Sequence, residues 1–243
     1  MSLRNYIDKT RKYFWFSREE LKALVIGILG GAFIYSWNKW GTEAFNAGEG
    51  VISLLTAMVL VGVALFIHHS GQRLLALFLG FKAEQKLSWY GFAIGLLIAM
   101  LSKGTIKIIA VSSTAAYLLP IHRLGAFRHG LNLATLTKIL LAGPIFNAGF
   151  ALLAHGAGII GIISTSLARE LFILNAIIAV CNMLPIPPLD GFKIFYTSPL
   201  FYVFWMGSFS AFAILGYLMI YSASIALFAG ALTALCFAVF KGE

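Results

Sequence analysis

Charged residues are scarce in this chain. Asp, Glu, Lys and Arg make up 11% of its 243 residues, whereas hydrophobic residues make up 60% and the mean hydropathy is +0.90. A soluble domain cannot hide that much apolar surface. The scarcity of charge therefore excludes a soluble globular protein and predicts an all-α polytopic membrane protein.

Acidic residues and cysteines are scarcer still. The chain has 9 Asp and Glu against 18 Lys and Arg, but no basic run is interleaved with aromatic residues, which excludes a nucleic-acid surface. We expect the excess positive charge to set the membrane topology instead. The two cysteines, Cys181 and Cys236, lie in apolar runs and indicate no redox compartment, so we expect both to serve packing.

A cleaved signal peptide is not apparent at the N-terminus. Residues 1–20 are charged and aromatic before the first apolar run begins, which favours an amphipathic segment at the membrane interface. Ser17 to Glu20 reads SREE, the S-x-x-E form of a capping box. This motif predicts that the first spanning helix starts just before Leu21.

Long apolar runs recur along the rest of the chain. A hydrocarbon core of about 30 Å needs about 20 apolar residues in a helix. Six windows are predicted to span the membrane: Leu21–Trp37, Val51–Leu79, Ile139–Ile163, Leu171–Leu184, Leu200–Tyr221 and Ile225–Phe240.

The region 81–138 interrupts this pattern. Phe92–Leu101 is apolar but too short to span comfortably, and Thr105–Thr114 is rich in β-branched residues and alternates as strands do. Non-helical backbone at membrane depth is tolerated only where protein or a water-filled cavity satisfies its polar groups. We expect a re-entrant or interfacial element with a small sheet, between spans two and three of a single domain covering residues 1–243.

Lys and Arg are concentrated on one predicted side of the membrane, the side expected to be cytoplasmic. That side holds Arg4, Lys9, Arg11, Lys12, Arg18, Lys22, Lys82, Lys86, Lys103, Lys107, Arg123, Arg128, Lys138, Lys193 and Lys241, and the other holds Lys39 and Arg169 with Glu43, Glu49 and Glu170. The distribution predicts an integral, multi-pass protein of the cell membrane with both termini in the cytoplasm.

Two adjacent histidines, His68 and His69, lie within the apolar run that begins at Val51. At about 1.5 Å per residue, His68 is about 26 Å along that helix, toward the cytoplasmic face. The fourth span ends at NMLPIPPLDG, which places Asp190 at a similar level. On the helix, His68 and Gln72 share one face, whereas His69 is rotated by about 100° from His68. We therefore expect polar groups far apart in sequence to meet in one layer.

A zinc-binding H-E-x-x-H helix requires histidines four residues apart, with a glutamate beside the first as general base. The corresponding residues here are HHSGQ. The first ligand position is filled by His68, but His69 occupies the position of the base and Gln72 that of the second ligand.

Three segments of the chain resemble the signature blocks of the site-2 protease family of intramembrane zinc metalloproteases, in its archaeal six-span form. The segments are IHHSGQRLLALFLGFKAE (67–84), LAGPIFNAGFALL (141–153) and NMLPIPPLDG (182–191). The resemblance extends from about Ser17 to the C-terminus. Its most specific part is N-x-x-P-x-x-x-L-D-G, which is complete here, and the G-P-x-x-N at Gly143 to Asn147 supports it.

The resemblance implies a role for each position of the degenerate motif. His68 matches the first zinc ligand and Asp190 the third, whereas His69 replaces the catalytic glutamate and Gln72 the second histidine. Zinc sites in proteins are built from Cys, His and carboxylates, so an amide is a poor substitute. We expect neither a catalytic residue nor a bound metal. His155 is predicted at the wrong depth to supply a third donor, and His122 or His129 could supply one only if the connector that holds them folds back into the bundle.

The resemblance predicts a catalytically inactive homologue that binds, scaffolds or assembles with other membrane proteins. Its partners would be the lipid bilayer and transmembrane segments of other proteins or of complex subunits. A retained groove for such a segment is expected at Asn182, Pro185, Leu189, Asp190 and Gly191. The alternative is an active intramembrane protease that holds zinc with an altered ligand set. A transporter or proton path built on the histidines and Asp190 is disfavoured, since further intramembrane carboxylates are missing.

Overall fold

The protein is described here by a computed structural model that covers residues 3–41, 45–119 and 131–241. The helices and strands in chain order are α1 (Leu3–Tyr13), α2 (Arg18–Ser36), the 3₁₀ turn η1 (Trp37–Lys39), α3 (Ala47–Leu79), β1 (Phe81–Leu87), α4 (Trp89–Leu101), β2 (Ser112–Leu118), α5 (Leu133–Ile159), α6 (Thr165–Asn182), α7 (Asp190–Thr197), α8 (Pro199–Tyr217) and α9 (Ala223–Lys241).

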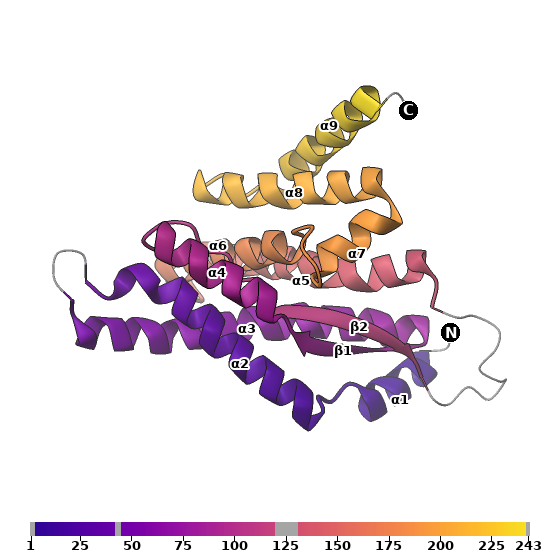
Figure 1. Cartoon of the computed structure of the whole chain (residues 1–243), viewed down its shortest axis with the longest axis horizontal. Helices are drawn as coiled ribbons and strands as arrows, with labels where there is room; N and C mark the ends of the chain where they lie inside the picture. The colour runs from indigo at the N-terminus through magenta and orange to yellow at the C-terminus, as the bar shows by residue number, and fades with distance from the viewer. Residues whose placement is uncertain (1–2, 42–44, 120–130, 242–243) are drawn as a thin grey trace.

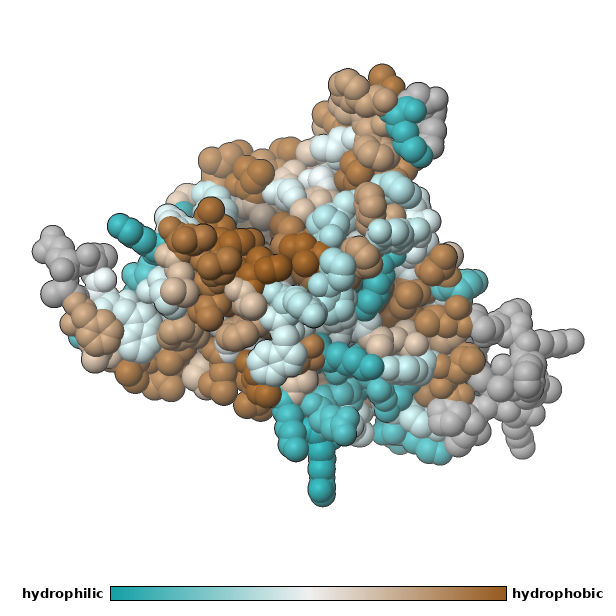
Figure 2. All heavy atoms as spheres, in the orientation of Figure 1, coloured by the Kyte–Doolittle hydropathy of each residue, from teal (hydrophilic) through white to brown (hydrophobic). Residues whose placement is uncertain are grey.

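Six of these helices, α2, α3, α5, α6, α8 and α9, are long and apolar enough to cross a membrane. They correspond to the six predicted windows, with ends shifted by a few residues. α3, α5, α6 and α8 run along the long axis of the molecule, whereas α2 crosses them obliquely and α9 projects away beyond α8 (Figure 1). Hydrophobic residues cover the middle of the face drawn in Figure 2, while hydrophilic side chains gather below, around the start of α2 and the strands. The chain is a multi-pass, all-α membrane protein with a small β element.

The start of α2 agrees with the SREE motif. Glu20 N donates to Ser17 Oγ at 3.3 Å, and Ser17 N donates to Glu20 Oε2 at 2.8 Å, which completes a capping box. The next span, α3, is 33 residues long and ends at Gly80, whose φ of 89° is readily adopted only by glycine. This turn leads directly into β1 and fixes where the sheet lies, at what we call the sheet end of the bundle.

The predicted sheet exists, but its position differs from the prediction. β1 and β2 pair antiparallel from Phe81↔Leu118 to Leu87↔Ser112, so only the last residues of the predicted strand region Thr105–Thr114 are in a strand. β1, which contains three charged residues in FKAEQKL, was not anticipated. Phe81, Ala83 and Leu87 alternate with charged residues, and burial alternates with them at the start of the strand. The sequence therefore carried a strand signal here that the expectation of strands at Thr105–Thr114 overlooked.

The apolar stretch after β1 forms α4, and residues 102–111 return beside it in a re-entrant hairpin. A Cβ added at Gly91 would lie 1.9 Å from Ala110 O, and one at Gly95 would lie 2.2 Å from Ile108 O. The returning backbone thus packs directly on the helix, where only glycine leaves room. In the membrane interior, the N–H and C=O groups of non-helical backbone must find hydrogen-bond partners within the protein or in a water-filled cavity.

The tip of this hairpin corrects the predicted placement of two lysines. A Cβ at Gly104 would lie 2.8 Å from Asn38 N, and Lys107 Nζ lies 4.4 Å from the centre of the Tyr35 ring. Lys103 and Lys107 therefore lie at the opposite end of the bundle from the sheet, with Lys39, and not with the N-terminal tail. A linear count of spans missed this because α4 and its return cross most of the bundle without being long enough to count as spans.

The packed core lies between α2, α3 and α6, where Val61, Leu65 and Ile178 are fully buried. Cys181 is buried in a separate cluster with Ala110 and Leu189, and its Sγ accepts from Ile109 N at 3.4 Å, as a packing role predicts. Cys236 is exposed on α9 and is not part of the packed interior. α9 packs mainly on α8 and stands apart from the other spans (Figure 1), leaving much of its apolar surface for lipid.

Candidate functional site

The HHSGQ segment (68–72) and the LDG segment (189–191) meet at the sheet end of the bundle. His68 and Gln72 come from α3, and Asp190 is the first residue of α7, which follows the loop 183–189 after α6. The side chains of all three are almost completely buried. Gln72 and Asp190, which are far apart in the sequence, are in direct contact here.

Gln72 is hydrogen-bonded on both sides of its amide. Its Nε2 donates to Asp190 Oδ2 at 2.8 Å and to Leu140 O at 3.2 Å, while Thr114 Oγ1 donates to its Oε1 at 2.5 Å. The two positions that match the second and third ligands of the resembling family are thus joined to each other directly. The amide nitrogen of Gln72 faces the carboxylate, and this nitrogen has no free lone pair with which to bind a metal. The contact is therefore an ordinary buried hydrogen bond and does not present two metal ligands side by side.

The other carboxylate oxygen of Asp190 is also occupied. Thr114 N donates to Oδ1 at 2.9 Å, and Lys193 Nζ lies 3.5 Å from the same atom, one turn further along α7. Lys193 Nζ also donates to Thr114 O at 2.6 Å and to Ser113 Oγ at 2.9 Å. Asp190 is therefore held by an amide, a backbone N–H and an ammonium, which together compensate its burial.

His68 and His69 are placed differently from Gln72. The centres of their rings are 5.2 Å apart, and the ring planes are inclined by 78° to each other. Neither nitrogen of His68 has a hydrogen-bond partner among the described residues, and the same is true of His69 Nε2. A Cβ at Gly143 would lie 2.4 Å from His68 Nε2, so α5 approaches the imidazole edge closely in the G-P-x-x-N segment.

The predicted groove residues form a tight turn between α6 and α7. Asn182, Leu189 and Gly191 are buried; Asn182 Nδ2 donates to Ile178 O at 3.0 Å, and a Cβ at Gly191 would lie 2.0 Å from Met183 O. Ser113 Oγ donates to Pro188 O at 2.7 Å, which attaches this turn to β2. Pro185 is exposed, so the structure brings four of the five residues into the interior and leaves one at the surface.

Two polar contributions were overlooked by the sequence analysis. Thr114 and Lys193 complete the Asp190 site, and no local motif signals them, because their role depends on the pairing of β2 and on one helical turn of α7. A buried ion pair between Arg73 of α3 and Glu20 of α2 lies nearby. An arginine inside an apolar run needs a partner, so Arg73 was itself a readable signal.

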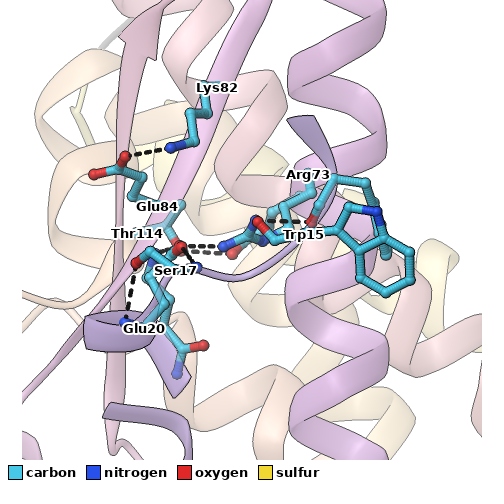
Figure 3. A network of polar contacts seen from close by, with 10 residues as sticks. Trp15, Ser17, Glu20, Arg73, Lys82, Glu84 and Thr114 are labelled. Carbon is cyan, nitrogen blue, oxygen red and sulfur yellow. Dashed lines mark hydrogen bonds and ion pairs between the residues drawn. The ribbon is translucent and has the colours of Figure 1, made fainter. Parts of the chain in front are cut away.

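The ion pair joins four parts of the chain (Figure 3). Arg73 Nη2 donates to Glu20 Oε1, Arg73 Nη1 donates to Phe14 O at 2.9 Å, and Gln85 N donates to Glu20 Oε1 at 3.0 Å. The guanidinium also lies 4.0 Å from the centre of the Phe16 ring. The network therefore fastens the α1–α2 connection and β1 onto α3, one residue beyond Gln72.

Other candidate ligands do not reach this site. Within residues 3–41, 45–119 and 131–241, no three His, Cys, Asp or Glu side chains are grouped so that they could hold a metal ion. His155 lies at the opposite end of the bundle, stacked on Tyr221 with 3.7 Å between ring centres. His122 and His129 lie outside the described residues.

The fold and this site define a multi-pass helical membrane protein with a buried polar layer at one end of its spans. The chain is 27% identical over 199 residues to a curated protein of Methanocaldococcus jannaschii named "Putative zinc metalloprotease". The match covers 76% of this chain and 88% of the relative. No family model matches the sequence, and no solved structure matches it.

Proposed function

We propose that this protein is a catalytically inactive relative of the site-2 proteases, which acts in the membrane as a binding, scaffold or assembly subunit. One observation carries the proposal: Gln72 Nε2 donates a hydrogen bond directly to Asp190 Oδ2 at 2.8 Å. The space where a metal would be shared between those two positions is taken up by this contact. The similarity to a protein named as a zinc metalloprotease supports the ancestry.

The donor set does not fit a zinc ion. Of the family's three ligand positions, only His68 and Asp190 carry donors that zinc prefers, and both oxygens of Asp190 already accept hydrogen bonds. An ion would have to displace Gln72 or Lys193 from the carboxylate. Only two ligands, His68 and Asp190, would bind the ion, and binding would break hydrogen bonds to Asp190. We therefore expect the site not to retain a metal ion.

Loss of the base position supports the same proposal. A hydrolytic water needs a general base within hydrogen-bond reach, and the family places a glutamate at position 69 for this purpose. His69 is buried, and its ring is inclined steeply to that of His68. We infer that the polar layer now serves packing, and that the partners are transmembrane segments of other proteins, which would approach the turn at the exposed Pro185.

The first test is metal analysis of the full-length protein purified in mild detergent. We expect less than one zinc per ten chains, and equal values for the unchanged protein and the Asp190→Asn variant. Stoichiometric zinc in the unchanged protein that is lost in Asp190→Asn would refute the proposal. If zinc is absent, chemical crosslinking in native membranes before purification would identify the partner subunit.

The second test restores the motif. His69→Glu combined with Gln72→His returns both missing groups, and we expect about one zinc per chain, because three good donors then converge. Adding His68→Ala to the double variant removes one donor and should abolish the gained zinc, which controls for unspecific binding. If the double variant folds but binds no zinc, the assignment to this family of sites is wrong.

An active intramembrane zinc protease with an altered ligand set is the second candidate. It is favoured by the unpaired ring nitrogens of buried His68 and by the name of the relative. The same measurements separate the two candidates: the active enzyme requires stoichiometric zinc in the unchanged protein, and cleavage of a transmembrane substrate that stops in Asp190→Asn.

A further inference from the structure

A second polar site lies at the end of the bundle remote from the sheet. There a cavity of about 670 Å³ is enclosed by the last turns of α2, α5 and α8, the start of α6 and the return segment after α4. It is larger than the other cavities described and is lined by both charged and aromatic side chains. None of the residues of the degenerate motif contributes to it.

The charges that line this cavity are unbalanced. Lys39, Lys107 and Arg169 carry positive charge, and Glu170 is the one carboxylate among the lining residues. Lys39 Nζ lies 3.4 Å from Glu170 Oε1, which leaves the other two cations without a carboxylate partner in the part of the chain described. The separate hollow beside η1 that contains Glu49 is lined by Lys39 and not by Lys107 or Arg169.

Two ammonium groups converge on one aromatic ring inside the cavity. Lys107 Nζ lies 4.4 Å and Lys39 Nζ 5.5 Å from the centre of the buried Tyr35 ring. Burial lowers the pKa of Lys107, the nearby Lys39 lowers it further, and Glu170 opposes both effects. Holding like charges close together in a half-buried place is costly, and a bound anion would relieve that cost.

The remaining walls suit a headgroup at a membrane interface. Arg169 is exposed at the rim and has no ion pair or hydrogen bond with any residue that the structure describes, so its planar guanidinium can bind two oxygens of a phosphate. Tyr217 and Tyr221 add aromatic surface of the kind that lies at headgroup depth. Basic pockets between transmembrane helices bind anionic lipid headgroups on the cytoplasmic or matrix side of membranes, and the same charge complementarity applies to a phosphate at this end.

We propose that this cavity binds a phosphate group, carried either by an anionic lipid of the facing leaflet or by a small soluble compound. Lys107 and Arg169 are the residues expected to contact its oxygens, with Lys39 shared between the phosphate and Glu170. The proposal is independent of the function assigned to the Gln72–Asp190 site, because the two sites lie at opposite ends of the bundle and share no residue.

The test measures binding by the full-length protein with two defined probes. In one arm the protein is delipidated in neutral detergent and titrated with inorganic phosphate, followed by native mass spectrometry and thermal unfolding. In the other arm it is placed in nanodiscs of phosphatidylcholine with increasing phosphatidylglycerol, and the lipids it retains are counted. The variants are Lys107→Gln and Arg169→Gln, with Lys103→Gln as the matched control, since Lys103 is exposed at the same end but does not line the cavity.

We expect Lys107→Gln and Arg169→Gln each to weaken binding about tenfold, the usual loss for one charge-assisted hydrogen bond, and Lys103→Gln to leave it unchanged. A response to phosphatidylglycerol alone would assign the site to a lipid headgroup, and a response to inorganic phosphate as well would assign it to small soluble phosphates. Absence of binding in both arms, or equal weakening by Lys103→Gln, would overturn the proposal. Because Arg169 is exposed, its variant is expected to fold even if Lys107→Gln does not.

Discussion

Single residues decide what the sheet end of this bundle can do. A buried charge is tolerated only where donors or an opposite charge compensate it, and both buried acids here meet that condition. Asp190 is compensated by Gln72, Thr114 and Lys193, and Glu20 by Arg73 together with Gln85 N. Gln72, at a position that the resemblance assigns to a metal ligand, is a neutral donor that satisfies the carboxylate directly.

Arg73 provides a prediction at this scale. Arg73→Met keeps the length and apolar stem of the side chain but leaves the Glu20 carboxylate buried without its cation. We expect the free energy of unfolding to fall by about 3–5 kcal/mol, the usual cost of breaking a buried pair by removing one partner. Titration of the purified protein with a denaturing detergent would measure it.

The control for Arg73→Met is the double variant that also carries Glu20→Gln. Removing both charges should recover at least half of the lost stability, because a neutral amide costs less to bury than an unpaired carboxylate. Equal destabilisation in the single and double variants would mean that Arg73 acts through its contacts with Phe14 O, Trp15 O and the Phe16 ring, and not through the ion pair.

Among the elements, the hairpin of α4 and its return segment departs furthest from a simple six-helix bundle. Its backbone is extended within the depth of the spans, yet Ser88 N donates to Val111 O at 2.9 Å and Ile109 N to Cys181 Sγ at 3.4 Å. The close approach depends on glycine at positions 91 and 95. The return segment leads into β2, and Thr114 N of β2 donates a hydrogen bond to Asp190.

Gly91 gives the prediction for this element. In Gly91→Ala the new methyl group would lie within 2 Å of Ala110 O, so the return segment must shift away from α4. We expect a loss of about 1–3 kcal/mol in the free energy of unfolding, as for overpacking elsewhere. Gly149→Ala in α5 is the matched control, because its Cβ would meet nothing within 4 Å and should be neutral or slightly stabilising. Equal losses in both variants would contradict the packing described for the hairpin.

Features of the fold that depend on one local signal were predicted correctly from the sequence. The SREE capping box, the six apolar runs and the i, i+4 relation of His68 to Gln72 depend on neighbouring residues alone, and the structure agrees with each. The pairing of β1 with β2, the tip of the hairpin and the role of Lys193 depend on contacts between distant segments. No periodicity encodes such contacts, so Gln72 and Asp190 were singled out from the sequence but Thr114 and Lys193 were not.

At the scale of the whole molecule, the arrangement of charge relates the fold to the membrane. Once Lys103 and Lys107 are assigned to the end remote from the sheet, that end holds four cations among the described residues, namely Lys39, Lys103, Lys107 and Arg169. The sheet end still holds more of them, since α1, the start of α2 and the strands carry most of the remaining Lys and Arg. The direction of the predicted asymmetry therefore survives the correction, and it favours a cytoplasmic sheet end.

Cysteine labelling in intact cells tests this orientation and the corrected position of the hairpin together. In a Cys236→Ser background, Lys103→Cys should react with a membrane-impermeant maleimide added outside, because its exposed side chain lies at the end remote from the sheet. Arg11→Cys, exposed on α1 at the sheet end, should react only after the membrane is permeabilised. The reverse pattern would show that the bundle is inverted, and protection of both sites in intact cells would place the hairpin tip on the same side as the N-terminal tail. Since Cys181 is buried, its contribution to the signal should stay low in all these variants, and the background variant measures it.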